Sequence, residues 1–442
     1  MSENAMSANH MEIYWHDYAG LSGDTPIRDA SLQEKASIIG RTGLIMLSCG
    51  TGAWRVRSAM NSLSQSLGLT CTADIGLMSI NCTFFDGKES LSQSLCLSTS
   101  GVNTTKLSLM GGFVKLFDDV YLPATCEDVH KALDDIVHMK GNYTPLQLGL
   151  AAAVACCAFT FLLGGGPVEM IGAFFGAGVG NYIRAKLSGR KLTLLLCIVA
   201  SISAACLTYF SVLTMAETLF HISVNHEVGY ICAVLFIIPG FPFITSFIDM
   251  AKLDLRSGTE RLLYALITIV VATLTAWIMA FTFHYAPGDF MPLTLQPLVQ
   301  FLLRLLASFC GVFGFSLMFN SDKRLAFVAA LIGAVSNTLR LELVDFTAMP
   351  PAAAAFLGAL TAGILASILN KEQGYPRITI TVPSIVIMVP GLYLYRGVYN
   401  LGIMNMTEAN QWLVAASLIV LALPLGLIFA RILTDKDFRH CS

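Results

Sequence analysis

The sequence predicts an α-helical polytopic membrane protein, with about ten transmembrane helices in two inverted five-helix repeats that contain broken helices. A small N-terminal α+β cytoplasmic domain precedes them. Three observations predict this fold class. The 442 residues are 55% hydrophobic and only 13% charged, which is far too apolar for a soluble globular protein. Apolar segments long enough to span a bilayer follow one another from Pro145 onward. Two of these segments are interrupted by the same Pro-Gly motif at corresponding places.

The region before the first apolar segment is predicted to lie outside the membrane. Residues 1–27 are polar and contain no apolar signal core, so we expect a disordered tail there. Residues 28–142 contain no segment of spanning length, and helical patterns alternate with strand-like ones. We therefore expect a cytoplasmic α+β domain with reduced thiols.

Local signals place the helices and strands of this domain. Ser31 and Glu34 form a capping box that opens a first helix, and the run Cys49-Gly50-Thr51-Gly52 ends it. Residues 74–99 alternate as strands do, on both sides of the turn Asp86-Gly87. Further helices are expected at 53–67, 109–121 and 126–140.

Apolar segments separated by Pro, Gly and charged clusters make up the remainder of the chain. They are residues 145–163, 167–183, 192–213, 228–250, 259–284, 295–318, 325–341, 351–369, 378–401 and 411–433. Each is long enough to cross a bilayer as a helix. We assign residues 143–285 to a first five-helix repeat, 286–434 to a second, and 435–442 to a short cytoplasmic tail.

Basic residues fix the expected orientation. Lys and Arg cluster after every second segment, at Arg184, Lys186, Arg190, Lys191, Lys252, Arg256, Lys323, Arg324, Lys371, Arg377, Arg431, Lys436 and Arg439. The alternate loops are almost free of them, and Arg340 is the exception. Because cytoplasmic loops carry the excess of Lys and Arg, both termini are expected in the cytoplasm.

Two internal echoes indicate the repeat. Ile238-Pro239-Gly240-Phe241-Pro242 and Val389-Pro390-Gly391 should each break a helix, because proline removes a backbone hydrogen bond. Their offset is 390 − 239 = 151 residues. Asn181-Tyr182-Ile183-Arg184 and Asn337-Thr338-Leu339-Arg340 repeat at 337 − 181 = 156. Each repeat holds an odd number of spans, so two in series must be inverted, as in many secondary transporters.

Several of these motifs resemble the threonine/serine exporter family. The resemblance rests on Ile238-Pro239-Gly240 with Asp249, on Leu253-Asp254-Leu255-Arg256-Ser257-Gly258, and on Val389-Pro390-Gly391 with Tyr395-Arg396. It covers the chain from about Lys35 to the last span, in a form that fuses two membrane halves. The family implies proton-motive-force-dependent export of threonine and serine from the cell, across the inner (plasma) membrane. A related two-protein system is associated with succinate export, so a dicarboxylate stays open as the alternative substrate.

The two breaks are the expected substrate site. Each is followed by a half-helix whose first N–H groups lack intrahelical partners and whose positive dipole end suits a carboxylate. Inverted repeats bring equivalent segments together near the midplane of the membrane. The predicted substrate-binding residues are Pro239, Gly240, Phe241, Pro242, Thr245, Ser246, Pro390, Gly391, Tyr393, Arg396, Asn181 and Asn337. For Asn181 and Asn337, helix packing is an equally good interpretation.

Other ionisable residues in the apolar segments are functional candidates by default, because a charge in a membrane is costly. Asp249 follows the first break and Glu169 opens the second span, and both are predicted to couple transport to protons. A solvated end residue is the alternative for Asp249, and helix-dipole stabilisation is the alternative for Glu169. Arg304 either snorkels to the outer surface or joins a polar stripe with Gln296 and Gln300.

An enzyme of the membrane, with a catalytic N-terminal domain, is the alternative from another class. Cys126, His130 and His138 lie close together in sequence, and His130 shares a helix face with Asp134. They form either a nucleophile or metal site, or the polar side of an amphipathic helix. Neither a nucleophile elbow nor a closed ligand set accompanies them, so no catalytic residue, metal or cofactor is expected.

The expected partners follow from these interpretations. They are a small-molecule substrate (threonine, serine or a dicarboxylate), protons and the lipid bilayer. The net charge of −2 gives no reason to expect nucleic acid. Assembly into a homo-oligomer stays open, and a passive channel is a further alternative within transport.

Overall fold

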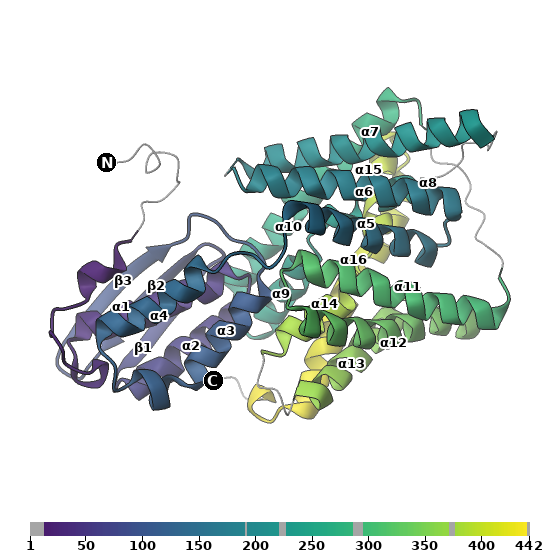
Figure 1. Cartoon of the computed structure of the whole chain (residues 1–442). Coiled ribbons are helices and arrows are strands. Elements are labelled where there is room, and N and C mark those ends of the chain that lie inside the picture. Colours follow the sequence, from purple (N-terminus) through teal and green to yellow (C-terminus); the bar gives the residue numbers. More distant parts are fainter. Residues whose placement is uncertain (1–12, 191, 221–226, 286–294, 371–375, 440–442) are drawn as a thin grey trace. The chain divides into compact units, whose positions relative to one another are not determined.

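The computed structural model describes residues 13–190, 192–220, 227–285, 295–370 and 376–439, which form two compact units (Figure 1). The first unit comprises Met1–Gly141, Thr245–Arg261 and Glu372–Thr379. The second comprises Asn142–Ile244, Leu262–Lys371 and Ile380–Ser442. Two short segments from the apolar half of the chain therefore belong with the N-terminal unit, which the sequence did not suggest.

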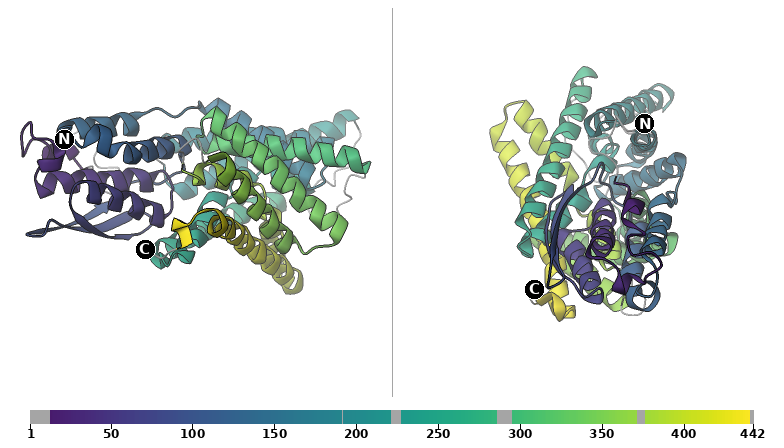
Figure 2. Two further views of the ribbon diagram at one scale, coloured as in Figure 1. Left: turned by 90° about the horizontal axis from the view of Figure 1, so that it is seen from below. Right: turned by 90° about the vertical axis from the view of Figure 1, so that its left-hand side faces the viewer.

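A three-stranded antiparallel sheet with helices on one face forms the first unit. The strands β1 (Thr70–Ile75), β2 (Ser79–Phe85) and β3 (Ser90–Cys96) are neighbours in chain order. The helices are α1 (Leu32–Ser48), α2 (Ala53–Ser66), α3 (Thr104–Lys115) and α4 (Cys126–His138). Figure 2 shows them on a single side of the sheet. Ile80, Cys82 and Phe84 of β2 face the helices and are buried, because successive strand residues point to opposite faces.

Local sequence signals account for most of these elements. The Ser31–Glu34 capping box is present at the start of α1, and Thr125 caps α4 by accepting a bond from the Asp128 N–H. Two boundaries were predicted wrongly. β1 starts at Thr70 rather than near residue 74, and α3 starts at Thr104 rather than 109, because Asn103 caps it.

The prediction of a disordered tail is wrong for residues 13–27. Trp15–Tyr18 and Ile27–Asp29 form short 3₁₀ helices, and Ile13 and Trp15 pack against the core of the unit. Ile27 is fully buried and donates its N–H to the Ala124 carbonyl. These apolar side chains give the segment enough buried surface to order it. The remaining residues of the predicted tail lie outside those described.

Helices make up the second unit, and α9, α10 and α14 also have residues in the first. They are α5 (Pro145–Leu162), α6 (Pro167–Ser188), α7 (Leu194–Phe220), α8 (Glu227–Cys232), α9 (Gly240–Ala251), α10 (Leu255–Thr282), α11 (Pro297–Met318), α12 (Lys323–Thr347), α13 (Pro351–Asn370), α14 (Ile378–Val386), α15 (Gly391–Gly402) and α16 (Met406–Thr434). Among the described residues, seven helices are long and apolar enough to cross a membrane, or up to nine if each bent pair is one span. The polytopic membrane fold is confirmed.

The predicted span that is not among these nine is α6. Its 22 residues are sufficient in length, but four glycines and the charged Glu169, Arg184 and Lys186 make it less apolar than the others. It packs between α5 and α7, so glycines serve close helix contact there. The Cβ of a side chain at Gly180, for example, would lie 2.8 Å from the Ala205 Cβ of α7.

Candidate functional site

Both Pro-Gly motifs break their helices, and they do so with the same backbone geometry. The segments on either side are bent by 60° at the first break and by 53° at the second. At the first break the Gly240 N–H donates to the Ile238 carbonyl, over 2.8 Å. At the second, the Gly391 N–H donates to the Val389 carbonyl, over 2.9 Å. Residues 151 positions apart therefore occupy equivalent places at the two breaks.

The two breaks are packed directly against each other within the second unit. A Cβ at Gly240 would lie 2.5 Å from Val386 Cγ2 and 3.2 Å from Val389 Cγ2, on the other break. Reciprocally, a Cβ at Gly391 would lie 2.6 Å from Leu235 Cδ2 of the first. Real Cβ atoms do not approach neighbours so closely, so a side chain at either position would force the opposite break to shift. The predicted meeting of the two breaks is observed, and substrate binding there stays a prediction.

Aromatic rings surround the breaks. Phe241, the first residue after Gly240, is buried and its ring centroid lies 5.5 Å from that of Phe319. Tyr230 of α8 and Tyr395 of α15 meet edge to face at 6.4 Å, which joins the two broken spans a second time. Pro239 and Pro242 are partly exposed.

The two half-helices differ in the donors that they offer. Helical bonding resumes at the Phe243 N–H in α9 and at the Leu394 N–H in α15. Phe241 and Leu392 match each other and both have a backbone N–H. Pro242 has none, whereas Tyr393 at the matching position of α15 has one. The N-terminus of α15 therefore has one more backbone donor before its helical ladder starts.

Asn181 and Asn337 both bind the first helix of their own half of the membrane region. Asn181 Nδ2 donates to the Leu148 carbonyl of α5 over 2.7 Å, and Asn337 Nδ2 donates to Ser308 Oγ of α11 over 2.9 Å. Both side chains are buried. These bonds give each asparagine a helix-packing role.

Arg184 and Arg340 lie three residues after these asparagines, and neither was among the site residues predicted from the sequence. Arg184 Nη1 approaches the Phe236 carbonyl, beside the first break, at 3.4 Å. The Arg340 Cβ and the Met388 Sδ, beside the second break, both lie 3.2 Å from the Cβ position of Gly358. Arg184 thus brings a guanidinium to the first break, whereas for Arg340 it is the Cβ that lies near the same glycine as Met388. The Asn–Arg echo at offset 156 was the signal that could have identified them.

Arg340 is held by a single bond among the described residues. Its Nε donates to Asn337 Oδ1 over 3.0 Å, and the side chain is half-buried. Since arginine can only donate, this bond also fixes the orientation of the Asn337 amide. Tyr393 lies within electrostatic range of the guanidinium. A half-buried arginine inside the protein explains why Arg340 departs from the pattern of cytoplasmic basic residues.

The other two predicted arginines have partners on neighbouring helices. Arg396 lies over the ring of Trp412 on α16, with its Cζ 4.9 Å from the ring centroid. Arg304 of α11 bonds two carboxylates of α12, Glu342 at 2.9 Å and Asp345 at 2.5 Å. Arg304 therefore neither snorkels alone nor joins the predicted stripe of glutamines.

The two predicted coupling carboxylates each contact a helix N-terminus. Glu169 is buried and accepts a bond from the Gly166 N–H at the start of its own helix α6. It also packs against the first broken span, since a Cβ at Gly229 would lie 2.7 Å from the Glu169 Cβ. Asp249 lies on α9 with the buried Thr245 and Ser246, in the first unit, where it accepts a bond from the Ala53 N–H of α2.

Cys126 and His130 form a structural network in the first unit. Burial, with a contribution from nearby Glu34, raises the pKa of the Cys126 thiol to about 12, so it is not a thiolate at neutral pH. Arg41 Nη1 donates to His130 Nδ1 over 3.0 Å, which leaves the proton on Nε2, facing Ser37 Oγ at 3.0 Å. Cys126 therefore lacks the properties of a nucleophile.

His130 makes the stability of this unit depend on pH. Burial, with Arg41 beside the ring, lowers the pKa of His130 from 6.5 to about 4. Between these two pH values the histidine is protonated in the unfolded chain but not in the folded one. The contribution of His130 to the free energy of unfolding is therefore fully present above pH 6.5. It falls by roughly 3 kcal/mol as the pH is lowered toward 4. Hydrogen bonds to Glu127 and Asp134 raise the pKa of His16, so the contribution of His16 to stability is present at low pH and is lost as the pH rises.

We expect His130→Asn to flatten this pH dependence. The amide oxygen of asparagine can still accept from Arg41, but the side chain does not titrate. The measurement is amide exchange in α1 and α4 between pH 4 and 7, corrected for intrinsic rates. His138→Asn on the exposed side of α4 is the matched control, and an unchanged slope in His130→Asn would contradict the assignment.

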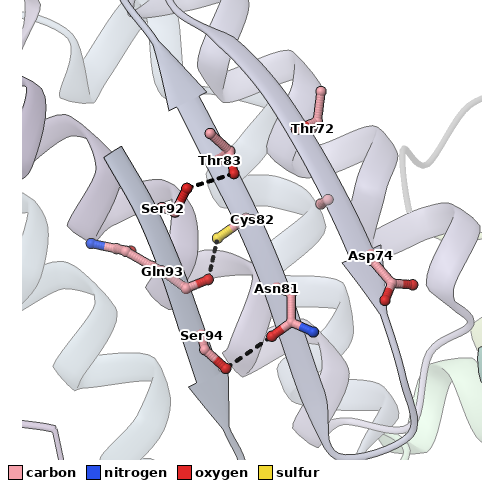
Figure 3. A pocket seen from close by; sticks show the side chains of 9 residues that line it. Thr72, Asp74, Asn81, Cys82, Thr83, Ser92, Gln93 and Ser94 are labelled. Atoms are coloured by element: carbon pink, nitrogen blue, oxygen red, sulfur yellow. Dashed lines mark hydrogen bonds between the residues drawn. The ribbon is translucent and has the colours of Figure 1, made fainter. Parts of the chain in front are cut away.

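The outer face of the sheet is a shallow polar hollow (Figure 3). Its side chains bond each other across the strands, Ser94 to Asn81 over 2.8 Å and Thr83 to Ser92 over 2.9 Å. It is lined by Thr72, Ala73, Asp74, Asn81, Cys82, Thr83, Ser92, Gln93 and Ser94. Hydroxyl and amide groups that satisfy each other in this way give no evidence of a ligand.

Two family models match the chain. The model described as "Putative threonine/serine exporter" matches residues 37–284, and the model described as "Threonine/Serine exporter, ThrE" matches residues 304–433. The chain is 25% identical over 243 residues to "Probable succinate transporter subunit YjjP" of Klebsiella aerogenes, which is 54% of this chain and 90% of that protein. Its counterpart in Escherichia coli (strain K12) is 25% identical over 244 residues, 54% of this chain and 91% of that protein. No solved structure matches.

Proposed function

Because the chain belongs to the threonine/serine exporter family, we propose that it is a secondary transporter that exports threonine and serine across the inner (plasma) membrane. The observation that carries the proposal is the direct packing of two broken helices against each other. Broken helices at matching places in two inverted repeats are where secondary transporters bind their substrates. The equal backbone bonds at the two breaks support such a repeat.

A dicarboxylate is the second candidate substrate, and a specific observation favours it. Arg184 lies beside the first break and Arg340 lies within electrostatic range of Tyr393, which follows the second, so two positive groups are candidates for two carboxylates. Threonine and serine carry one carboxylate and one ammonium group, and they would use only one of these arginines. The likeness to proteins named as succinate transporter subunits is consistent with this alternative.

We propose that export is coupled to the proton gradient, with Glu169 ahead of Asp249 as the coupling carboxylate. Glu169 packs against the start of the first broken span, an element expected to move during transport. The charge of Asp249 is already balanced by Arg261, with 3.4 Å between Oδ2 and Nε. Glu169→Gln should uncouple export from an imposed pH gradient while exchange of substrate across the membrane continues.

Transport by the purified protein in proteoliposomes tests the function. The reconstituted protein inserts in both orientations, so export can be measured as uptake into the vesicles. We expect uptake of threonine and serine to be driven by an imposed pH gradient and to stop when a protonophore is added. Succinate in place of the amino acids tests the alternative. Failure to transport any of the three would contradict the proposal, and flux that is indifferent to the protonophore would indicate a channel.

Thiol labelling in cells tests the proposed orientation, which rests on the loop charges. In a cysteine-free protein, Thr218→Cys and Thr407→Cys should react with an impermeant reagent from outside. Ser188→Cys and Lys436→Cys should react only after the membrane is opened. All four positions are exposed, unlike the buried Ser257, and the reverse pattern would contradict cytoplasmic termini.

A further inference from the structure

Helix α2 of the N-terminal domain is capped by a carboxylate from another part of the chain. Its own N-cap residue is Gly52, which has no side chain to accept a bond. Asp249 Oδ2 accepts from the Ala53 N–H over 3.1 Å and from Ser257 Oγ over 2.9 Å. Asp249 is fully buried, and its Oδ1 has no hydrogen-bond partner among the described residues. This oxygen occupies the space that a Cβ at Gly52 would need.

Arg261 completes this contact. It is 2% exposed and donates to the Gly50 carbonyl over 3.2 Å and to the Thr51 carbonyl over 2.6 Å. Its Nε also donates to Ser257 Oγ over 3.1 Å. Gly50 has a φ of +83°, which turns the chain between α1 and α2 so that both carbonyls are presented. The first residue of α2 is therefore bound by an acid from α9, and the loop before it by a base from α10.

Further contacts hold the same connection around this buried pair. Arg57 pairs with Asp254, and Arg256 pairs with Asp74 of β1. Glu260 accepts from the Leu77 N–H over 2.6 Å. These contacts involve α2 and the β1–β2 turn, so the domain holds the whole segment 245–261 rather than one point of it.

A second segment of the membrane half is held by α3. A Cβ at Gly111 would lie 2.9 Å from Pro376 Cγ, and Ile378 packs against the core of the N-terminal domain. Segment 245–261 directly follows the first break along α9, and residues 376–379 directly precede the second break along α14. Both segments lie at the ends that the loop charges place in the cytoplasm.

We propose that the N-terminal domain is a clamp that positions the cytoplasmic ends of both broken helices, with Asp249 and Arg261 as its central contact. A buried carboxylate and guanidinium are costly to separate, because each would remain as an uncompensated charge. The ends of α9 and α14 are therefore built into the N-terminal unit rather than lying free beside it.

Moving the acid from position 249 to position 52 tests this clamp. Gly52→Asp gives α2 its own cap, so the domain stays folded, but the new side chain collides with Asp249. In the intact protein we expect amide exchange in residues 245–261 to rise about tenfold or more, while α1 and α4 are unchanged. In Gly52→Asp with Asp249→Ala the acid again faces Arg261, so protection should return.

The rate of export is the second measurement. Its interpretation rests on the proposed function, whereas that of amide exchange does not. We expect Gly52→Asp to reduce export about tenfold or more at equal insertion, and the double variant to recover it. Protection that stays unchanged in Gly52→Asp, or a double variant no better than the single one, would overturn the clamp. Lost protection with normal export would overturn its positioning role.

Neighbouring glycines on α3 provide a matched pair for the second contact. Gly111→Ala places a methyl group against Pro376, whereas the Cβ of Gly112→Ala meets nothing within 4 Å. Both changes raise helix propensity equally. We expect Gly111→Ala, and not Gly112→Ala, to raise exchange in residues 376–386. Equal behaviour of the two variants would remove α3 from the clamp.

Discussion

Replacing Pro239 and Gly240 together with alanine is expected to abolish export while the protein still inserts into the membrane. The same result is expected for Pro390 and Gly391. Alanine restores the backbone donor and the helical preference at each break, which favours a continuous helix. The new methyl groups also collide with the opposite break, at Val386 in the first case and Leu235 in the second. We expect a loss of about 100-fold or more, since both the half-helix ends and their contact disappear.

Controls separate this effect from general damage to the membrane region. Pro297 occupies the first turn of α11, where proline is tolerated but not required, and a Cβ at Gly189 meets only ordinary contacts at 3.5 Å. Pro297→Ala with Gly189→Ala should therefore export normally. Export at normal rate and affinity in both break variants, at matched expression, would show that the breaks are not the substrate site.

The breaks could be predicted from the sequence because their cause is local. Proline and glycine act on the backbone of their own helix, wherever the rest of the chain lies. The capping box at Ser31 was predictable for the same reason. The start of β1 was placed too late because Thr70 to Ala73 carry weakly apolar side chains, and this part of the strand depends on pairing with β2.

The contacts of Asp249 could not be predicted, because they depend on tertiary structure. The sequence presents a carboxylate near the end of an apolar segment, and this is equally compatible with a solvated end or a coupling group. Its partners Ala53 and Arg261 are 196 and 12 positions away, at places that only the fold brings together. Gly52 likewise has no special local pattern, although a carboxylate from another segment requires it to be glycine.

The arginines beside the breaks lie between these two cases. The repeated Asn–Arg motif could be seen in the sequence. The asparagines rather than the arginines were predicted as site residues, because amides commonly bond across membrane helices. The structure assigns the asparagines to packing against α5 and α11, through Leu148 and Ser308. Arg184 approaches the Phe236 carbonyl beside the first break, and Arg340 bonds Asn337. The electrostatic part of substrate recognition is therefore best tested at Arg184 and Arg340.

Arg340→Gln is expected to raise the KM for export by about 10- to 100-fold, because a hydrogen bond to a charged group contributes about 1.5–3 kcal/mol. Glutamine keeps a donor that can reach Asn337 but removes the charge. If the substrate is a dicarboxylate, Arg184→Gln should raise the KM to a similar extent, since each carboxylate then uses one guanidinium. If the substrate is threonine or serine, one of the two variants should retain nearly normal affinity.

Lysine variants and a remote arginine complete this test. Arg340→Lys keeps the charge and should recover part of the affinity, which a purely structural role would not predict. Arg304→Gln is the control, since Arg304 is already neutralised by Glu342 and Asp345 away from the breaks. The measurement is initial transport rate against concentration for threonine, serine and succinate in proteoliposomes. Unchanged KM for all three substrates in both Arg184→Gln and Arg340→Gln would exclude these arginines from substrate binding.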